Sequence, residues 1–417
     1  MRGTLKKAIF LVSVLPLAAA MLMGATVTAA APNWQVETID RSGTGRFSSL
    51  KIDKAGNAHV VFVVDDGEHY PLKYGFWDHS LKRWFFMTVD GNASFSSLVL
   101  DSKQRPHISY ADYGTMNGCK LRYAYWDGAA WKKQAIPINA EIVAYYTSIV
   151  LDRNDRPSIS YYEYTGPKGT DFRVRMRVVT FTGAYWQVIT VDGQNQSGKF
   201  NAMDIDAQEH LHLAYANVNA MTAGMRYGFF DGKSWSVEVF DGHEQNNEQN
   251  VGYSTCLALD KDGNPHVSYL NYTKPAVKYA VRKNGRWQTQ VVEQLSAISY
   301  PDRNSIIVDD NGTPYIGYYD ASRGSLKLAH PEGQNWVIEV VDSNGVGPTS
   351  SLQIDHGTIW ISYADEANNA LKVAHRELKK DHPANASQGA ETRPAQAARP
   401  EASAGNGAPK QAAPHAQ

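Results

Sequence analysis

The chain has 417 residues, which suffices for two or three ordinary domains or for one large repeat domain. It carries 41 Lys and Arg against 42 Asp and Glu, and this balance excludes the electrostatic footprint of a protein that binds nucleic acid or an anionic membrane surface. The 23 Tyr and 10 Trp favour β-strands over helices.

The N-terminal segment has the pattern of an export signal. Basic Arg2, Lys6 and Lys7 precede an apolar stretch at 8–23, and small residues follow at 27–29. A signal peptide is preferred to a membrane anchor because the apolar run is short and is followed by small residues rather than charges. We therefore expect a cleaved signal peptide at 1–29, a mature chain without a membrane span, and a protein that is periplasmic or secreted.

A repeat of about fifty residues follows. Seven segments end a hydrophobic strand with Asp, and successive Asp residues lie 46 to 54 positions apart. Self-similarity at such a period indicates a solenoid, a propeller or an array. The segments are FSSLKID (47–53), FSSLVLD (95–101), YTSIVLD (146–152), FNAMDID (200–206), STCLALD (254–260), RNSIIVD (303–309) and TSSLQID (349–355).

Each copy continues in the same way. A polar turn leads to a strand of the type HVSY (266–269), a variable loop leads to a strand of the type LKYA (121–124), and a turn such as DGKS (231–234) leads to a strand that opens with Trp. Asp-Gly or Asn-Gly between alternating apolar runs is a strong hairpin signal. Each unit is thus four short antiparallel strands, which is one propeller blade with the Asp-ended strand innermost.

The two ends of the repeat region predict how the ring closes. A Trp strand at 33–40 precedes the first unit, and the last unit stops after its third strand at 371–377. We predict an all-β, seven-bladed propeller at 30–377, in which the first strand completes the last blade and removes the exposed edges. Residues 378–417 are rich in Ala, Pro, Gln and Gly, and we expect them to be disordered.

The two cysteines fall in different blades. Cys119 lies in blade two and Cys256 in blade five. A disulfide needs Cα atoms within roughly 7 Å. We expect two unpaired thiols.

The run LALDKDGNPHVSYLNYTKPAVKYAVRKNGRW (257–287) resembles the repeat of exported bacterial propellers grouped loosely with Asp-box or sialidase-like proteins. The resemblance covers 33–377 and all seven copies. It implies the propeller fold. Seven-bladed exported relatives include sugar-binding lectins and polysaccharide lyases, so the resemblance leaves both functions open.

One position of the third strand is basic in every copy, and a polar residue ends the second strand across the same hairpin. We interpret these positions as a ring of ion pairs within the blades. In blades four and five the polar residues are Asn217 and Asn271, which predicts spare charge on Arg226 and Lys278 for a carboxylate or sulfate if these bases have no other partner. The bases are Lys73, Arg122, Arg177, Arg226, Lys278, Lys327 and Lys372, and the polar residues are Asp65, Asp112, Glu163, Asn217, Asn271, Asp320 and Asp365.

Four histidines also repeat: His59, His107, His212 and His266. One per blade is too dispersed for a metal site, so we expect each to fix its turn by a hydrogen bond. The Asp residues that end the inner strands should accept backbone N–H bonds in the same turns. We expect neither metal nor cofactor.

Loop lengths place a candidate ligand site on blades three to six, where the loops at 137–145, 193–199, 242–253 and 294–302 are long. Aromatic rings with a few charged groups suit a saccharide or another anionic ligand. For Tyr146 and Phe200 the alternative is a plug of the central channel, together with Phe47 and Phe95. The candidate ligand-binding residues are Tyr145, Tyr146, Lys199, Phe200, Arg226, His243, Tyr253, Lys278, Tyr300 and Arg303.

Three functions remain open from the sequence. We favour a non-catalytic module that binds a glycan, another anionic ligand or a protein partner. A glycan-cleaving enzyme is the alternative. A lyase would use Tyr253 or His243 as base beside Arg303 or Arg226, and a glycosidase would draw two carboxylates from Glu141, Glu244 and Asp302. A structural envelope protein is the third hypothesis.

Overall fold

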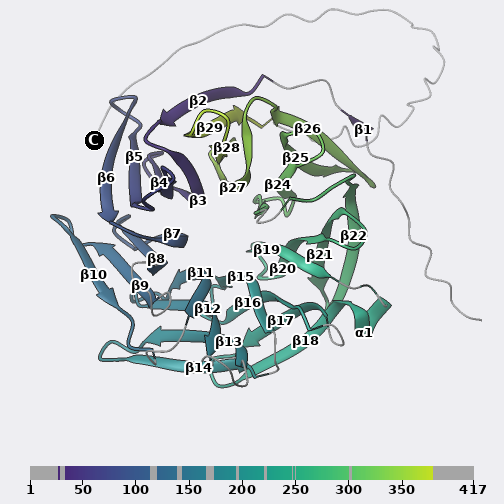
Figure 1. Ribbon diagram of the computed structural model, residues 1–417. Helices are drawn as coiled ribbons and strands as arrows, with labels where there is room; N and C mark the ends of the chain where they lie inside the picture. Colours follow the sequence, from purple (N-terminus) through teal and green to yellow (C-terminus); the bar gives the residue numbers. More distant parts are fainter. Residues whose placement is uncertain are drawn as a thin grey trace, which may run out of the picture. The chain divides into compact units, whose positions relative to one another are not determined.

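The structure is a computed structural model. It describes residues 27–28, 33–112, 120–138, 143–165, 173–193, 197–219, 223–246, 248, 250–299 and 303–378. These residues form seven sheets around a central channel (Figure 1). The seven-bladed propeller predicted from the repeat is confirmed.

Each blade contains four antiparallel strands, and in blades one to six these follow one another along the chain from the channel outwards. The innermost strands are β3 (Thr44–Ile52), β7 (Ser94–Leu100), β11 (Val143–Leu151), β15 (Ser197–Ile205), β19 (Val251–Leu259), β23 (Ser305–Val308) and β27 (Val346–Asp355). The second strands are β4 (Ala58–Asp65), β8 (Pro106–Asp112), β12 (Pro157–Thr165), β16 (Leu211–Asn217), β20 (Pro265–Asn271), β24 (Pro314–Asp320) and β28 (Thr358–Asp365).

The outer half of each blade is formed by two further strands. The third strands are β5 (Leu72–Asp78), β9 (Lys120–Trp126), β13 (Arg173–Phe181), β17 (Gly224–Phe230), β21 (Ala276–Lys283), β25 (Ser325–Glu332) and β29 (Ala370–Glu377). The outermost strands are β6 (Arg83–Asp90), β10 (Trp131–Ala135), β14 (Trp186–Asp192), β18 (Trp235–Gly242), β22 (Arg286–Gln294), β26 (Asn335–Asp342) and β2 (Gln35–Asp40). A four-residue helix, α1 (His243–Asn246), follows β18.

The N-terminal strand closes the ring as predicted. β2 pairs antiparallel with β29, with Gln35 opposite His375 and Thr38 opposite Lys372, and so supplies the outermost strand of blade seven. The two-residue β1 (Val27–Thr28) lies in the segment predicted as a signal peptide and pairs in parallel with β26. The rest of that segment and the predicted tail beyond Leu378 lie outside the described residues.

The core lies between the blades. Every residue of β8, β16 and β20 is buried, because each sheet is covered on both faces by its neighbours. Between blades one and two, for example, Val61 and Tyr74 pack with Leu98, Ile108 and Tyr110. A propeller therefore owes its stability to contacts between neighbouring blades around the ring.

Most inner strands carry a bulge that shapes the channel. The pairing register shifts between Arg46 and Ser49 in blade one, and shifts at the corresponding place in blades two to five. The residue at each bulge has a left-handed backbone with φ between 51° and 54°. A bulge of this kind re-aims one side chain. The bulge residues are Phe47, Phe95, Tyr146, Phe200 and Ser254.

Candidate functional site

The bases of blades four and five are paired with acids of the preceding blade or of the loop after it, and this corrects the prediction of spare charge. Arg226 Nη1 lies 2.9 Å from Asp192 Oδ2. Lys278 Nζ lies 2.6 Å from Asp241 Oδ2 and 2.8 Å from Glu248 Oε2. The prediction was wrong because it judged charge balance within one hairpin, whereas the acids come from the preceding blade and from the loop after it.

These ion pairs belong to an interblade triad, which we define as an acid that ends an outermost strand together with a tyrosine and a base of the next blade. The hydroxyl of Tyr269 donates to Asp241, beside Lys278. Burial and the nearby acid raise the pKa of this hydroxyl well above its usual value. The same tyrosine–acid bond recurs as Tyr110–Asp90, Tyr215–Asp192, Tyr318–Glu293 and Tyr363–Asp342.

Ion pairs within the blades are confirmed for Arg122–Asp112, Arg177–Glu163, Lys327–Asp320 and Lys372–Asp365. Blade one differs from the prediction. Lys73 lies 3.0 Å from Asp40 of blade seven, and Asp65 pairs with Arg46 instead. The signal for the missed partners is the acid that ends most of the outermost strands, as in TID (38–40) and VVE (291–293).

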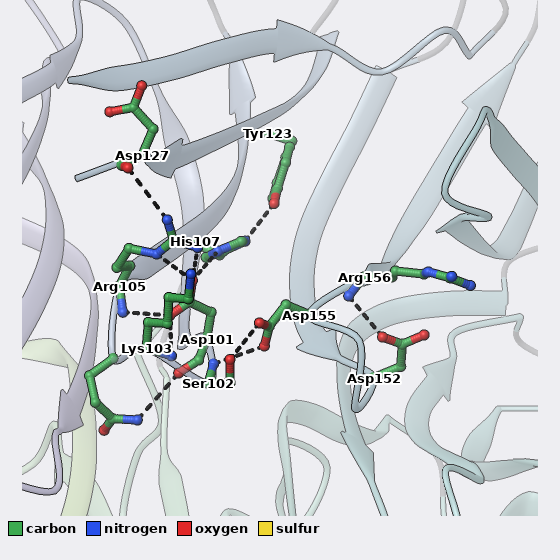
Figure 2. A network of polar contacts seen from close by, with 11 residues as sticks. Asp101, Ser102, Lys103, Arg105, His107, Tyr123, Asp127, Asp152, Asp155 and Arg156 are labelled. Carbon is green, nitrogen blue, oxygen red and sulfur yellow. Dashed lines mark hydrogen bonds and ion pairs between the residues drawn. The ribbon is translucent and has the colours of Figure 1, made fainter. Parts of the chain in front are cut away.

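The repeated histidines of blades one, four and five are hydrogen-bonded to the Asp of their turns, as predicted, whereas His107 only lies near its Asp, with 3.4 Å between His107 Nε2 and Asp101 Oδ2. In blade two, His107 lies between the carboxylate of Asp101 and the hydroxyl of Tyr123 (Figure 2). Asp101 also accepts the backbone N–H groups of Lys103 and Arg105. The corresponding sets are Asp53–His59–Tyr74, Asp206–His212–Tyr227 and Asp260–His266–Tyr279.

These histidines are held in the neutral form. Burial lowers the pKa of His107, although the charge of Asp101 opposes the shift. For Asp101 burial acts in the raising direction, but the hydrogen bonds from Arg105 outweigh it and lower the pKa. Among the described residues, no group of three His, Cys, Asp or Glu side chains is arranged to hold a metal ion.

Aromatic side chains of the bulges meet across the channel, and we call Phe47, Phe95, Tyr146 and Phe200 the channel plug. Neighbouring ring centroids lie 4.7 Å apart for Phe47 and Phe95, 4.6 Å for Phe95 and Tyr146, and 4.7 Å for Tyr146 and Phe200. The sequence position that is aromatic in these four blades is Arg303 in blade six. The Arg303 guanidinium carbon lies 5.2 Å from the Phe47 ring centroid and 5.7 Å from that of Phe95.

A second set of rings lies next to the plug, and we call Tyr145, Tyr162, Lys199, Tyr253 and Tyr272 the channel mouth. The Tyr253 ring lies 5.0 Å from Phe200 and 4.3 Å from Tyr272, between ring centroids. Lys199 Nζ lies 5.9 Å from the centroid of Tyr162. Within the described part of the chain, no carboxylate forms an ion pair with Lys199, and burial lowers the pKa of its amine. The structure thus brings Tyr145, Tyr146, Lys199, Phe200, Tyr253 and Arg303 together near the channel.

Below the plug, the next residue of each inner strand forms a polar ring: Ser48, Ser96, Thr147, Asn201, Thr255, Asn304 and Ser350. These residues line a cavity of 200 Å³ together with Tyr146, Phe200 and Arg303. One residue further along, serines join the blades, because Ser49 accepts the N–H of Leu98 and Ser97 accepts the N–H of Ile149. The repeated Ser-Ser of the inner strands therefore has an architectural use that the sequence analysis missed.

The candidate His243 lies away from the channel. His243 begins α1, which directly follows an outermost strand and lies at the outer edge of the ring (Figure 1). Tyr300, Glu141 and Asp302 lie outside the described residues, as do Cys119 and the side chain of Glu244. Cys256 is a free thiol whose Sγ donates to the carbonyl of Asn304, and burial raises its pKa to about 12.

The fold defines the chain as a seven-bladed β-propeller. No family model matches it, and no curated protein matches its sequence. The helical residues that the structure describes form no segment long and apolar enough to cross a membrane.

Solved structures that resemble the chain include other proteins with very different sequences. One is a Trypanosoma rangeli sialidase in complex with 2,3-difluorosialic acid, with 10% identity and a TM-score of 0.49 over 84% of this chain and 60% of the sialidase. Another is a Dyadobacter fermentans protein of unknown function, with 10% identity and a TM-score of 0.49 over 82% of this chain and 99% of that protein. A third is the Aleuria aurantia lectin with α-methyl-L-fucoside, with 13% identity and a TM-score of 0.49 over 74% of this chain and 98% of the lectin.

The chain thus spans only about three fifths of the length of the sialidase. Because the sequence identities and TM-scores are this low, the similarities indicate neither a ligand nor an activity for this chain.

Proposed function

We propose that this propeller is a non-catalytic binding module that takes an anionic glycan at the channel mouth. One observation carries the proposal: Lys199, which forms no ion pair with a described carboxylate, lies beside Tyr162 in a continuous arc of aromatic rings. Rings offer apolar faces to the C–H groups of a sugar, and the amine offers its charge to a carboxylate or sulfate.

The mouth is suited to hold a ligand because its parts are already in place. Tyr253 is packed between Phe200 and Tyr272, and Tyr145 meets Phe95 edge to face, so their rings need little further ordering when a ligand binds. Lys199, Tyr145, Tyr253 and Tyr272 are all partly exposed. A partly desolvated amine gains more from an anion than a fully hydrated one does.

Charge on Lys199 gives the proposal a pH signature. Burial lowers the pKa of the amine, and a bound anion would favour its protonated form. Glycan binding should therefore weaken as the pH rises, at a pH below the ordinary lysine value of about 10.4.

A lyase remains the second candidate because Tyr253, its proposed base, lies in the same aromatic arc as Lys199 through Phe200 and Tyr146. Arg226, which was considered as the residue that neutralises the substrate carboxylate, pairs with Asp192. The binding module is preferred because the aromatic faces and the one cation of the mouth can hold an anionic glycan.

The test uses the full chain on an array of glycans, followed by titration with a soluble polyuronate and with a neutral glucan. We expect saturable binding of the polyuronate alone. Lys199→Met should weaken it roughly 10- to 100-fold, as expected for the loss of a hydrogen bond to a charged group, and Tyr253→Ala should weaken it as well. Lys233→Met is the matched control, because Lys233 is exposed in a turn far along the chain from the mouth, and it should bind as the parent does.

Three outcomes would count against the proposal. Equal binding by the parent and Lys199→Met would place the ligand elsewhere. Release of an unsaturated product from the polyuronate would identify a lyase. A chain that binds no glycan but recovers a protein partner in a pull-down would support the structural envelope protein.

A further inference from the structure

Blade six carries an unusual pair of consecutive residues, Arg303 and Asn304, at the start of its inner strand. The plug position is Phe in three blades, Tyr in a fourth, Ser or Thr in blades five and seven, and it is charged in blade six alone, as Arg303. The next position is part of the polar ring, where five blades have Ser or Thr, blade four has Asn201 and blade six has Asn304. Both residues line the 200 Å³ cavity. Because both unusual side chains belong to one blade and face the same cavity, they indicate a local role. A role in the architecture of the ring would recur in the other blades.

The other members of the polar ring are satisfied by neighbours. Ser96 donates to the carbonyl of Phe47 at 2.8 Å, and Thr147 donates to that of Phe95 at 2.7 Å. Asn201 donates to the carbonyl of Gly198 and accepts from Ser160. The ring thus has a regular way of pairing its polar groups. The remaining pairs are Ser48 with Ser362, Thr255 with Gly252 and Ser350 with Ser305.

Asn304 breaks this regularity. Its side chain is buried, with the residue only 2% exposed, and neither its Nδ2 nor its Oδ1 has a hydrogen-bond partner among the described residues. Leaving a buried amide unpaired is costly because the group loses its hydrogen bonds to water and gains none in the protein. Such a group in a native protein requires an explanation, and a bound molecule that supplies one donor and one acceptor is a direct one.

Arg303 supplies the charge. Its guanidinium lies by the rings of Phe47 and Phe95, and no described carboxylate forms an ion pair with it. Burial lowers its pKa, and the charge effects of Cys256 and Tyr146 oppose the shift. Further down the channel, the charges of Asp204 and Lys51 act on each other. Arg303 is therefore a cation of this cavity that no described carboxylate pairs with, as Lys199 is at the channel mouth.

We infer that the cavity beneath the plug is a site for a small hydroxy-carboxylate, held by Arg303 and Asn304. The planar guanidinium can donate two parallel hydrogen bonds to a carboxylate. The Asn304 amide can donate to a carboxylate oxygen and accept from an adjacent hydroxyl, which satisfies both of its unpaired atoms. The volume corresponds to about six waters, which limits the ligand to a small molecule or to one terminal sugar acid.

The site is separate from the channel mouth and does not depend on the glycan proposal. A second cavity of 430 Å³ shares Lys51, Ile149, Met203 and Leu257 with the first and is also lined by residues of the turns that follow the inner strands, such as Ser102 and Arg153. A free acid can therefore approach from the face of the ring that carries those turns.

The test measures the melting temperature of the full chain at fixed ionic strength with lactate, glucuronate, acetate or glycerol. Two variants restore residues that the repeat itself uses: Arg303→Phe, as at Phe47 and Phe95, and Asn304→Ser, as at Ser48 and Ser96. We expect lactate or glucuronate to raise the melting temperature saturably in the parent, with acetate at least severalfold weaker because it lacks the hydroxyl. Arg303→Phe should weaken binding at least about tenfold, and Asn304→Ser severalfold.

The arms separate the sources of the ligand. A response to lactate identifies a free small acid, and a response to glucuronate alone identifies a terminal sugar acid. No saturable response to either acid, or an equal response in Arg303→Phe, would overturn the inference. Arg303→Gln and Asn304→Ser keep the test decisive if Arg303→Phe fails to melt cooperatively. The two proposals are tested separately. If Lys199→Met loses polyuronate binding while Arg303→Phe keeps it, the result supports the glycan site at the mouth and does not bear on the small-acid site.

Discussion

Polar groups differ between two regions of the molecule, the interfaces between neighbouring blades and the central channel. Between blades, Lys278 has two carboxylate partners and Tyr269 donates to the same Asp241, and the arrangement recurs around the ring. In the channel, Lys199 and Arg303 have no ion-pair partner among the described residues, and Asn304 has an unpaired amide. The comparison teaches that a polar position repeated and paired around the ring serves the architecture, whereas a polar side chain of one blade that has no described partner points to a ligand.

Replacement of one lysine from each region tests the comparison most directly, and it should give the largest difference in the free energy of unfolding. Lys278→Met would leave Asp241 and Glu248 buried without their cation, and breaking a buried pair in this way costs about 3–5 kcal/mol. Lys199→Met removes a partly buried amine that no described carboxylate pairs with, so the free energy of unfolding should stay the same or rise slightly. Denaturant unfolding of both variants measures the difference. Equal losses would mean that Lys199 is structural too.

A pair of tyrosines sharpens the same comparison within the interfaces. Tyr269→Phe removes a donor from the buried carboxylate of Asp241 and should cost about 1–3 kcal/mol. Tyr161 holds the equivalent place in blade three, where its hydroxyl has no hydrogen-bond partner among the described residues and the preceding strand β10 ends in Ala135. Tyr161→Phe should therefore leave thermal unfolding unchanged. A large loss in that variant would show that the hydroxyl has another use.

The smallest expected effect is a loss of folding stability at mildly acidic pH, caused by the buried histidines. Burial lowers the pKa of His59, His107, His212 and His266, so the unfolded chain binds protons near its ordinary histidine pKa of about 6.5 while the folded chain does not. Stability should fall as the pH drops below about 6.5, before the aspartates with lowered pKa lose their contribution as the pH falls below about 3.9.

The melting temperature between pH 8 and pH 5 measures this step. His107→Ser places the residue of blade three, Ser158, in blade two and should flatten the slope. An unchanged slope would mean that His107 has the same pKa in the folded chain as in the unfolded chain.

The fold was predictable because each blade is local in the sequence. The hairpin turns and the Asp-ended strand predict the four strands of each blade. The Trp strand at 33–40 precedes the first complete unit, and this predicted that it pairs with β29 and closes the ring. Contacts between blades were not predictable in the same way, because which outer-strand acid meets which base depends on how one sheet packs on the next. The partners of Arg226 and Lys278 were missed for this reason.

The candidate site was predicted in part. Aromatic residues at the start of the inner strands did meet near the channel, where Tyr146 and Phe200 form the plug and Tyr145, Lys199 and Tyr253 the mouth. Asn304 was missed, although aligning the residue after each plug position would have shown a column of Ser and Thr interrupted by two asparagines. Only packing distinguishes them, because the Asn201 side chain is bonded to Gly198 and Ser160, while the Asn304 side chain has no hydrogen-bond partner among the described residues.

A crystal structure of the full chain soaked with an oligouronate tests the account most directly. We predict density for a sugar ring against Tyr253, with its carboxylate within hydrogen-bonding distance of the Lys199 amine. Density between blades beside Lys278, with the channel mouth empty, would contradict the division between architectural and ligand-binding polar groups.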